Sequence, residues 1–292
     1  MANSLIWQEE WSTKLQERLD HPTNWKAVAR VMYSDSKVIN MPYIPIGSEP
    51  AVAASVSRGT AYTYTDVTIT NESITIGTYR PIAIFIDRAD QAQSNFIDQM
   101  EMAELQGQKI NELVESLMLA DHASFTNFGD TGGGALGLGS TGIVVSATNI
   151  DDIIRGVKRE IFKANGQNIA ARNGMFFVWR PADFELLEQF IQANGFTTSD
   201  MALKDGAVSG IKYMGVDHYV SNDFTTSHVF AGVKNVYTIG ILRSTYGQIV
   251  INQDPPAGGG GPISGIGIVS RLDYGLKVWT HTTPILFDVN VV

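Results

Sequence analysis

The residues of this chain that might bind a metal ion or carry a proton are few and scattered. The chain has no cysteine, which excludes disulfides, cysteine-ligated zinc, iron–sulfur clusters and cysteine nucleophiles. Its five histidines are His21, His122, His218, His228 and His281. No two of them stand at the spacing of an H-E-x-x-H or H-x-H motif. We therefore predict no catalytic residue and no metal site, and we interpret each isolated histidine as a surface or core residue.

One glycine motif suggests a phosphate-binding loop but has the wrong surroundings. Gly137, Gly139 and Gly142 spell G-x-G-x-x-G. Such a motif binds a pyrophosphate only where it follows a strand and opens a helix. Here a long predicted helix precedes the loop and a predicted strand follows it. We interpret the motif as an ordinary loop and predict no nucleotide site and no cofactor.

Three acidic residues share one predicted helix and offer the remaining route to acid–base chemistry. They are Asp183, Glu185 and Glu188. Without a second group beside them we interpret these residues as a solvated helix face. A pair of carboxylates brought together by the fold stays open at this stage. A soluble α+β enzyme with an unrecognised site is therefore kept as a remote alternative.

The composition is that of a folded protein with an acidic surface. The chain has 292 residues, of which 44% are hydrophobic and 17% charged, and its net charge is −9. This length predicts roughly two domains, and the acidic balance argues against tight binding to duplex DNA. No run approaches the ~18 apolar residues of a membrane span. Glu9 and Glu10 come too early for a signal peptide, so we expect folding in the cytoplasm.

The N-terminal segment has one apolar stripe. Residues 4–20 are predicted to form a short helix that ends before Pro22. Its stripe recurs at every fourth residue and consists of Trp7, Trp11, Leu15 and Leu19. The stripe packs either on the chain's own core or on a neighbouring subunit, and both interpretations stay open here. As candidates for a subunit interface, the four residues form one predicted site.

Residues 37–86 are predicted to be extended, with a further strand pair interrupted near Pro81. Two prolines in KVINMPYIPI exclude a central, fully paired strand. The segment 47–60 has too little apolar surface to offset a backbone entropy of about 1–2 kcal/mol per ordered residue. It is therefore predicted to gain its order from a neighbour. Its candidate interface residues are Gly47, Pro50, Val52, Val56 and Arg58.

The strongest local pattern predicts a long helix over residues 94–121, roughly 40 Å in length. Its apolar seam comprises Phe96, Met100, Ala103, Gly107, Ile110, Val114 and Leu117. The stretch from 87 to 122 carries eight acidic and two basic residues, which we interpret as a solvated face.

Strands and helices then alternate. Strands are predicted at 143–147, 175–179, 211–220, 228–231, 236–242, 263–271 and 275–290, and helices at 149–164 and 181–194. Asn149 and Asp152 resemble a capping box at the start of the first of these helices.

The order of these elements resembles the major capsid proteins of tailed phages, which have the Hong Kong phage capsid or Johnson fold. The extended finger, the strand VTITNESITIGTYRPIAIFID and the long helix are similar to that family's E-loop and spine helix. MFFVWRPADFELL resembles its strand–proline–helix segment. YMGVDHYVS resembles a further strand, although Asp217 follows Val216 where the family pattern differs. VFAGVKNVYTI and THTTPILFDV also fit.

The resemblance implies an α+β fold in four parts. They are an N-terminal arm (1–36), an E-loop (37–70), a peripheral domain (71–142 with 255–292) and an axial domain (143–254). It implies a structural protein without enzymatic activity that assembles pentamers and hexamers into an icosahedral shell around a double-stranded DNA genome. An encapsulin-like nanocompartment shell is the alternative that shares this fold.

The resemblance also implies partners. Besides copies of itself, the chain is expected to meet a portal, decoration proteins and packaged DNA without sequence-specific contact, and no membrane. Only some 36 residues precede the finger, so a natural start at Met1 predicts that scaffolding comes from a separate protein or is not needed. The expected location is the virion, after assembly in the host cytoplasm.

Overall fold

The computed structural model describes residues 13–19, 23–44, 59, 67–87, 96–129, 142–194, 211–224, 227–253 and 264–291, with the side chains of the long helix described from residue 102. The helices are an N-terminal helix (13–19), α2 (Asn24–Val28), α4 (Phe96–Ala120), α5 (Ile150–Lys163), α6 (Gln167–Asn173) and α7 (Pro181–Ala193). Short 3₁₀ turns are η1 (Asp121–Ser124), η3 (Arg243–Thr245) and η4 (Thr283–Ile285).

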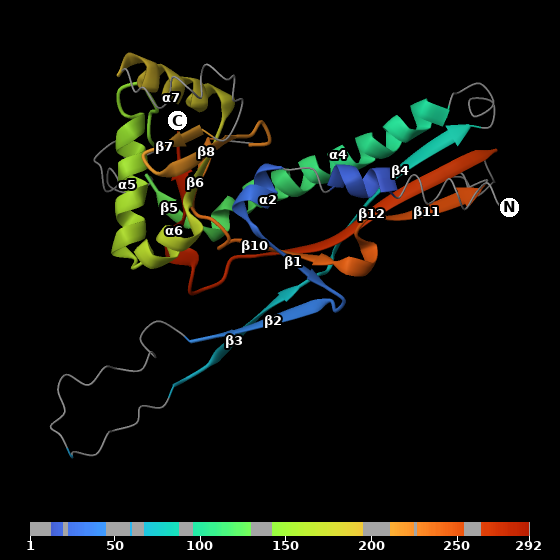
Figure 1. Cartoon of the computed structure of the whole chain (residues 1–292), viewed down its shortest axis with the longest axis horizontal. Helices are drawn as coiled ribbons and strands as arrows, with labels where there is room; N and C mark the ends of the chain where they lie inside the picture. Colours follow the sequence, from blue (N-terminus) through green and yellow to red (C-terminus); the bar gives the residue numbers. More distant parts are fainter. Residues whose placement is uncertain are drawn as a thin grey trace.

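The strands fall into two larger sheets and one hairpin. They are β1 (Arg30–Ser34), β2 (Val38–Tyr43), β3 (Thr70–Thr75), β4 (Thr78–Asp87), β5 (Thr126–Phe128), β6 (Met175–Trp179), β7 (Ile211–Tyr213), β8 (Val216–Val220), β9 (His228–Val233), β10 (Thr238–Leu242), β11 (Gln248–Gln253), β12 (Gly265–Lys277) and β13 (Leu286–Asn290). Helices and strands both build the core, so the predicted α+β class is confirmed (Figure 1).

A five-stranded sheet forms one arm of the molecule. Its order is β1-β10-β12-β11, and β4 pairs with β12 along ten residues. Two predicted interruptions are wrong, because β12 continues without a break through residues 271–275 and β4 continues through Pro81, opposite Arg271. Among the described strands β4 pairs with β12 alone, and an edge strand tolerates a residue that has no N–H to donate.

The predicted long helix is confirmed as α4, which runs beside this arm (Figure 1). Ala103, Ile110 and Val114 of its predicted seam are buried in the core. The buried amide of Gln106 fixes the helix to β12, because it accepts a hydrogen bond from the Ser270 hydroxyl at 2.5 Å. Helix and sheet therefore form one packed layer pair.

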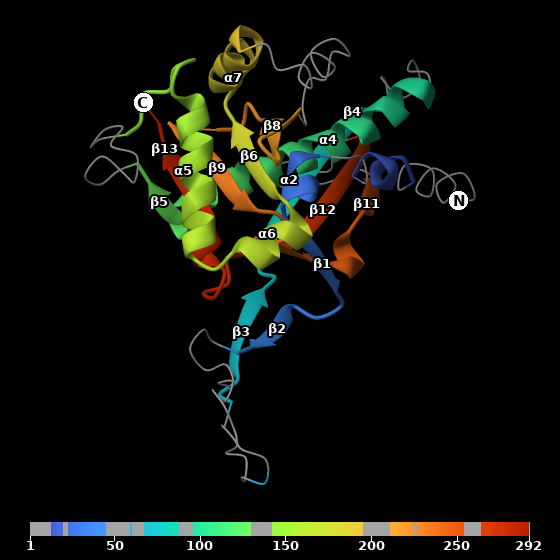
Figure 2. The same ribbon diagram turned by 60° about the vertical axis from the view of Figure 1, so that its left-hand side comes forward.

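A six-stranded sheet forms the other half, in the order β5-β13-β9-β6-β8-β7. The run MFFVW forms β6, whose five residues are all buried, as predicted. Pro181 opens α7 at its first turn, also as predicted. α5 and α6 contact β9, and α5 packs against α7 (Figure 2).

Several local predictions for this half are wrong. Residues 144–146 form no strand, and only Ile143 makes a bridge, to Val291. β5 forms instead at 126–128. The capping box is absent, because the Asn149 side chain accepts from the Ser146 N–H at 2.8 Å and donates to the Val144 carbonyl at 2.7 Å. α6 was not predicted, and neither was β11 in the five-stranded sheet.

The N-terminal stripe is corrected in part. Leu15 and Leu19 are 0% and 2% exposed and belong to the chain's own core, so they are not subunit-interface residues. The helix lies close to α4, where a Cβ on Gly107 would be 2.9 Å from the Arg18 Cβ. The N-terminal helix and α4 thus pack closely at Gly107, and both leucines are buried within the subunit.

Each of the two larger sheets contains strands from both the peripheral and the axial domain that the resemblance implies. β10 and β11, from the predicted axial domain, pair with β12, while β13, from the predicted peripheral domain, pairs with β9. The four-part division remains a prediction. Within the described residues, no helix is both long enough and apolar enough to cross a membrane.

Candidate functional site

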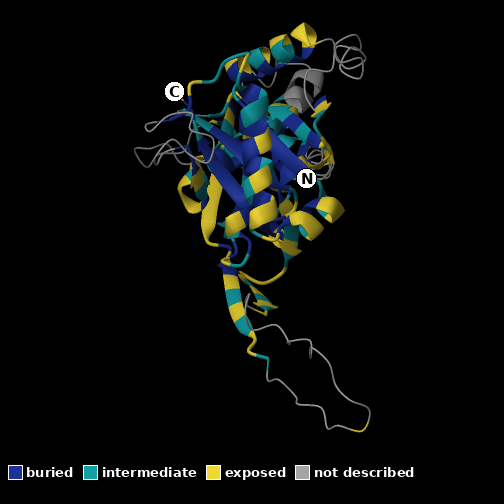
Figure 3. Cartoon of the chain, turned by 90° about the vertical axis from the view of Figure 1, so that its left-hand side faces the viewer, coloured by how far each residue is buried: buried dark blue, intermediate teal, exposed yellow. Residues whose placement is uncertain are grey.

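The most prominent candidate for an assembly surface is the hairpin of β2 and β3, which projects from the body (Figures 1 and 3). The strands pair antiparallel from Val38 opposite Thr75 to Tyr43 opposite Thr70. Exposure alternates along both strands, so one face is partly covered and the other is open. Beyond the last pair, Ile44 and Ile69 are 44% and 67% exposed. The hairpin thus presents apolar side chains that no described residue of the subunit buries.

Two facing glycines make room for the root of the hairpin. Gly240 and Gly275 stand opposite each other in β10 and β12. A Cβ on Gly275 would clash with the Thr75 carbonyl oxygen, and one on Gly240 would lie 3.3 Å from Ile74 Cδ1. Because both positions lack a side chain, the end of β3 lies directly on the five-stranded sheet, and Ile74 and Ile76 are buried there.

Polar contacts hold the hairpin from its other side. The Glu72 carboxylate accepts hydrogen bonds from the Tyr43 hydroxyl at 2.8 Å and the Thr280 backbone N–H at 3.2 Å. Burial opposes ionisation of Glu72, but these hydrogen bonds outweigh it and its pKa is lowered. The Tyr43 ring stacks on His281, with centroids 4.4 Å apart. The base of the hairpin is therefore fixed, while its far end is not covered.

The other predicted interface residues lie outside the described residues. They are Trp7, Trp11, Gly47, Pro50, Val52, Val56 and Arg58. Their role at an interface stays a prediction. The glycine motif at 137–142 also lies outside, apart from Gly142.

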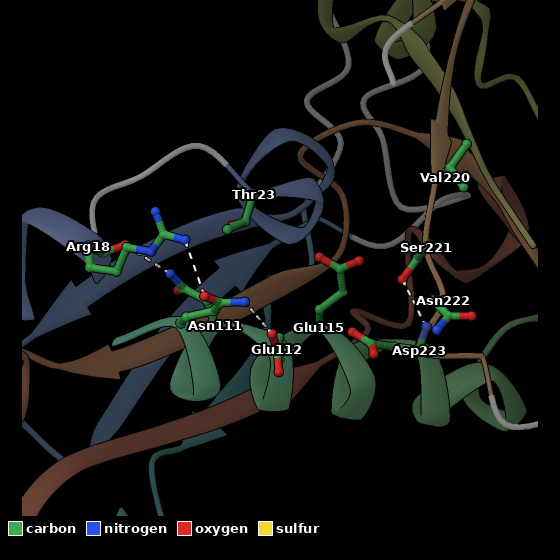
Figure 4. A pocket seen from close by; sticks show the side chains of 10 residues that line it. Arg18, Thr23, Asn111, Glu112, Glu115, Val220, Ser221, Asn222 and Asp223 are labelled. Atoms are coloured by element: carbon green, nitrogen blue, oxygen red, sulfur yellow. Dashed lines mark hydrogen bonds between the residues drawn. The ribbon is translucent and has the colours of Figure 1, made fainter. Parts of the chain in front are cut away.

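A polar cleft of about 510 Å³ opens among the described residues (Figure 4). It lies between the N-terminal helix, α4 and the segment after β8. Its lining comprises Arg18, Thr23, Gln108, Asn111, Glu112, Glu115, Val220, Ser221, Asn222 and Asp223. Thr23 Oγ1 and Asn111 Oδ1 are buried there without a hydrogen-bond partner among the described residues. The cleft is therefore rich in acceptors.

Its carboxylates are shifted by their surroundings. Burial raises the pKa of Glu115, helped by the charge of Asp223 and opposed by hydrogen bonds from Ser221 and Asn24. Burial also raises the pKa of Asp223, together with the charge of Glu112. The sequence offers one signal for this surface, since Asn111 and Glu115 lie four residues apart beside the apolar seam. No histidine is among the described residues that line the cleft.

Asp183 and His218, which the sequence singled out, are both buried and have structural roles. Asp183 is buried and forms two hydrogen bonds with the Arg180 guanidinium, at 2.6 and 3.0 Å. His218 is buried as well, where its Nδ1 accepts from the Trp179 indole N–H at 2.9 Å. Burial lowers the pKa of His218 to about 4. A neutral histidine packed in this way is a core residue.

Two other histidines come together although their sequence spacing gave no sign of it. The Nδ1 atoms of His122 and His228 lie 3.1 and 2.8 Å from the two carboxylate oxygens of Asp288. The three residues come from η1, β9 and β13. Their separation in the sequence, 166 and 60 residues from Asp288, explains why no linear motif reveals them.

The fold is that of phage capsid proteins. No protein-family model matches the sequence, and no curated protein matches it. Solved structures do. A structure from Mycobacterium phage Che8 is 15% identical with a TM-score of 0.57, covering 87% of this chain and 84% of that one. The capsid of cyanophage P-SCSP1u is 15% identical with a TM-score of 0.55, covering 93% and 88%.

A virus-like particle from Pyrococcus furiosus has the same fold, with 11% identity, a TM-score of 0.57 and coverage of 97% and 99%. The chain thus has the tailed-phage capsid fold that the order of its elements predicted, with its long helix and projecting hairpin. At these identities the likeness concerns the fold.

Proposed function

We propose that this chain is a major capsid protein, a structural subunit that assembles with copies of itself into a closed shell. The observation that carries the proposal is the match of nearly the whole chain to capsid structures. The projecting hairpin supports it, because Ile44 and Ile69 expose apolar surface that a neighbouring subunit would bury.

The finer part of the proposal concerns what the shell contains and where it forms. We propose pentamers and hexamers in an icosahedral shell of a tailed phage, located in the virion and assembled in the host cytoplasm. A net charge of −9 per subunit suits a shell that encloses double-stranded DNA without gripping it. A scaffolding protein, a portal and decoration proteins are its proposed partners.

The alternative is an encapsulin-like nanocompartment shell; a virus-like particle from Pyrococcus furiosus is one of the similar solved structures, but this likeness does not support the alternative better than the phage capsid. Both functions require the same subunit fold and the same self-assembly. They differ in the content of the particle, which no feature of the described subunit decides.

Electron microscopy of the purified full-length chain tests the proposal. We expect closed particles or ring-shaped capsomers, and light scattering should show assembly that increases with protein concentration. Particles from the natural source that contain long double-stranded DNA support the phage capsid, and particles filled with protein support the alternative. A chain that stays monomeric in lysate and after purification, and that saturably binds a small molecule, contradicts both and favours the enzyme.

A further inference from the structure

The cluster of His122, His228 and Asp288 lies where the long helix meets the six-stranded sheet. His122 belongs to η1, the turn that follows α4, while His228 begins β9 and Asp288 lies in β13. β13 and β9 are paired, which sets Asp288 and His228 on the same part of the sheet. The two imidazole rings stack with their centroids 3.8 Å apart. One carboxylate therefore accepts hydrogen bonds from two histidine side chains at once.

The donor atoms suit a particular class of ion. Two imidazole nitrogens and one carboxylate oxygen all lie within 4.8 Å of one another. Imidazole together with carboxylate favours zinc and its neighbours in the first transition series, whereas calcium and magnesium prefer oxygen ligands alone. We propose that His122, His228 and Asp288 bind a divalent transition-metal ion, with Zn²⁺ as the expected occupant and water in the remaining position.

The spacing requires only small movements for this purpose. Bonds of about 2.1 Å in a tetrahedral site place neighbouring ligand atoms about 3.4 Å apart. The His122 Nδ1 lies 3.1 Å from Asp288 Oδ2 and the His228 Nδ1 lies 2.8 Å from Oδ1, and the three ligand atoms are all within 4.8 Å of one another, so modest side-chain shifts reach that spacing. The two rings have the freedom to turn apart, because the His122 and His228 side chains are 29% and 19% exposed. The same exposure admits the ion from solvent.

Binding changes the protonation pattern of the rings in a defined way. Without an ion, each Nδ1–H donates a hydrogen bond to the Asp288 carboxylate. With an ion, each Nδ1 offers its lone pair, and the proton of the neutral ring moves to Nε2. The bound ion then links the end of α4 to two paired strands, so it stabilises the folded subunit by mass action.

Thermal unfolding of the full-length chain tests the proposal after treatment with EDTA. At a hundredfold excess of free Zn²⁺ over its Kd, the apparent Tm should rise by about 5 °C. Co²⁺ should also raise it and give the visible absorption of a low-symmetry site, whereas Mg²⁺ should change nothing. The absence of any rise with Zn²⁺ and Co²⁺, or an equal rise with Mg²⁺, overturns the proposal.

Two further measurements locate the ion. The Asp288→Asn variant and the double variant His122→Gln/His228→Gln should lose the Zn²⁺ response, whereas the control His281→Gln should keep it, because His281 lies against Tyr43 instead. In the unaltered chain, Zn²⁺ should protect His122 and His228, but not His281, from acylation by diethylpyrocarbonate, as read by peptide mass. A response that survives in the double variant, or unprotected His122 and His228, places the ion elsewhere and refutes the site.

Discussion

The six-stranded sheet and the β2–β3 hairpin are built on opposite principles. In the sheet, all of β6 and nearly all of β9 are buried, and α5, α6 and α7 supply cover. In the hairpin, exposed and half-covered residues alternate, and the far end carries exposed isoleucines. An isolated two-stranded ribbon is marginally stable in water. The comparison teaches that the surfaces that stabilise the subunit are separate from the exposed apolar end of the hairpin, which is the proposed contact with other copies.

At the root of the hairpin, the buried core and the exposed hairpin are joined. There, Ile74 and Ile76 lie on the paired glycines of the five-stranded sheet, and Glu72 contacts the N–H of Thr280. Contacts with the body thus set the direction in which the hairpin projects. The side chains at its far end are not buried in the core. Variants in the core, at the root and at the far end should therefore differ in kind as well as in size.

The largest loss of subunit stability is expected in the core. Phe230 in β9 is 2% exposed and contacts the rings of Phe125 and Phe176, at 4.5 and 5.1 Å between centroids. Phe230→Ala leaves a cavity there and should lower the free energy of unfolding by about 3–5 kcal/mol in urea denaturation. Phe162→Ala is the matched control, since Phe162 on α5 is 42% exposed and should change stability by less than about 0.5 kcal/mol. Equal losses would show that α5 is packed differently.

Acid should weaken the same core through His218. Burial lowers the pKa of this histidine from its usual 6.5 to about 4. The unfolded chain therefore binds the proton more tightly, so stability is complete above pH 6.5 and is lost as the pH falls toward 4, by about 3 kcal/mol.

The His218→Gln variant isolates this effect. A glutamine oxygen can still accept the Trp179 indole N–H, but the amide does not titrate in this range. Unfolding free energies of the two chains, measured at several pH values between 7 and 4, should converge as the pH falls. Parallel curves would mean that His218 has the same pKa in the folded and the unfolded chain, so that burial does not lower it.

The core was also the part of the molecule that the sequence predicted best. MFFVW is a continuous apolar run and Pro181 follows it, so strand and helix were both identified. The seam of α4 has helical periodicity over about six turns, from Phe96 to Leu117. These patterns are local, and each element buries the face that its own periodicity marks.

The features that require two distant segments were not visible. The break expected near Pro81 is absent, since pairing with β12 carries β4 through the proline. From the sequence, Leu15 and Leu19 fit equally well on the chain's own core or on a neighbouring subunit. The close approach of α4 at Gly107 decides for the chain's own core. His122, His228 and Asp288 meet only because β13 pairs with β9. The spacing of residues along the sequence does not show which distant segments come into contact.

The root of the hairpin should show an intermediate effect. Gly275→Ala introduces a Cβ that clashes with the Thr75 carbonyl oxygen, a backbone atom that cannot move aside by rotation. We expect a loss of about 1–3 kcal/mol, with faster amide exchange in residues 70–76. Gly77→Ala is the control, because its Cβ would meet nothing closer than Thr75 Cγ2 at 3.9 Å. If Gly275→Ala behaves like Gly77→Ala, the hairpin does not rest on the glycine pair.

The smallest effect on the subunit should accompany the largest effect on assembly. Ile44 and Ile69 are 44% and 67% exposed, so the double variant Ile44→Ser/Ile69→Ser removes apolar surface that is already in water. The free energy of unfolding of the unassembled subunit should change by less than about 0.5 kcal/mol. If a neighbouring copy buries these side chains, each loses about 1.5–3 kcal/mol of burial on assembly, repeated at every contact of the shell. Particle yield in electron microscopy should therefore fall sharply.

Val250→Ser provides the comparison that makes this outcome specific to the hairpin. Val250 is 45% exposed but lies on β11, in the five-stranded sheet. This variant should match the double variant in subunit stability and the unaltered chain in particle yield. If both variants assemble normally, the hairpin is not an interface element, and the apolar surface of Ile44 and Ile69 has another use. If both variants fail to assemble, exposed apolar side chains on the five-stranded sheet also contribute to assembly. The hairpin is then less distinct from the body as an assembly surface than the structure of the subunit indicates.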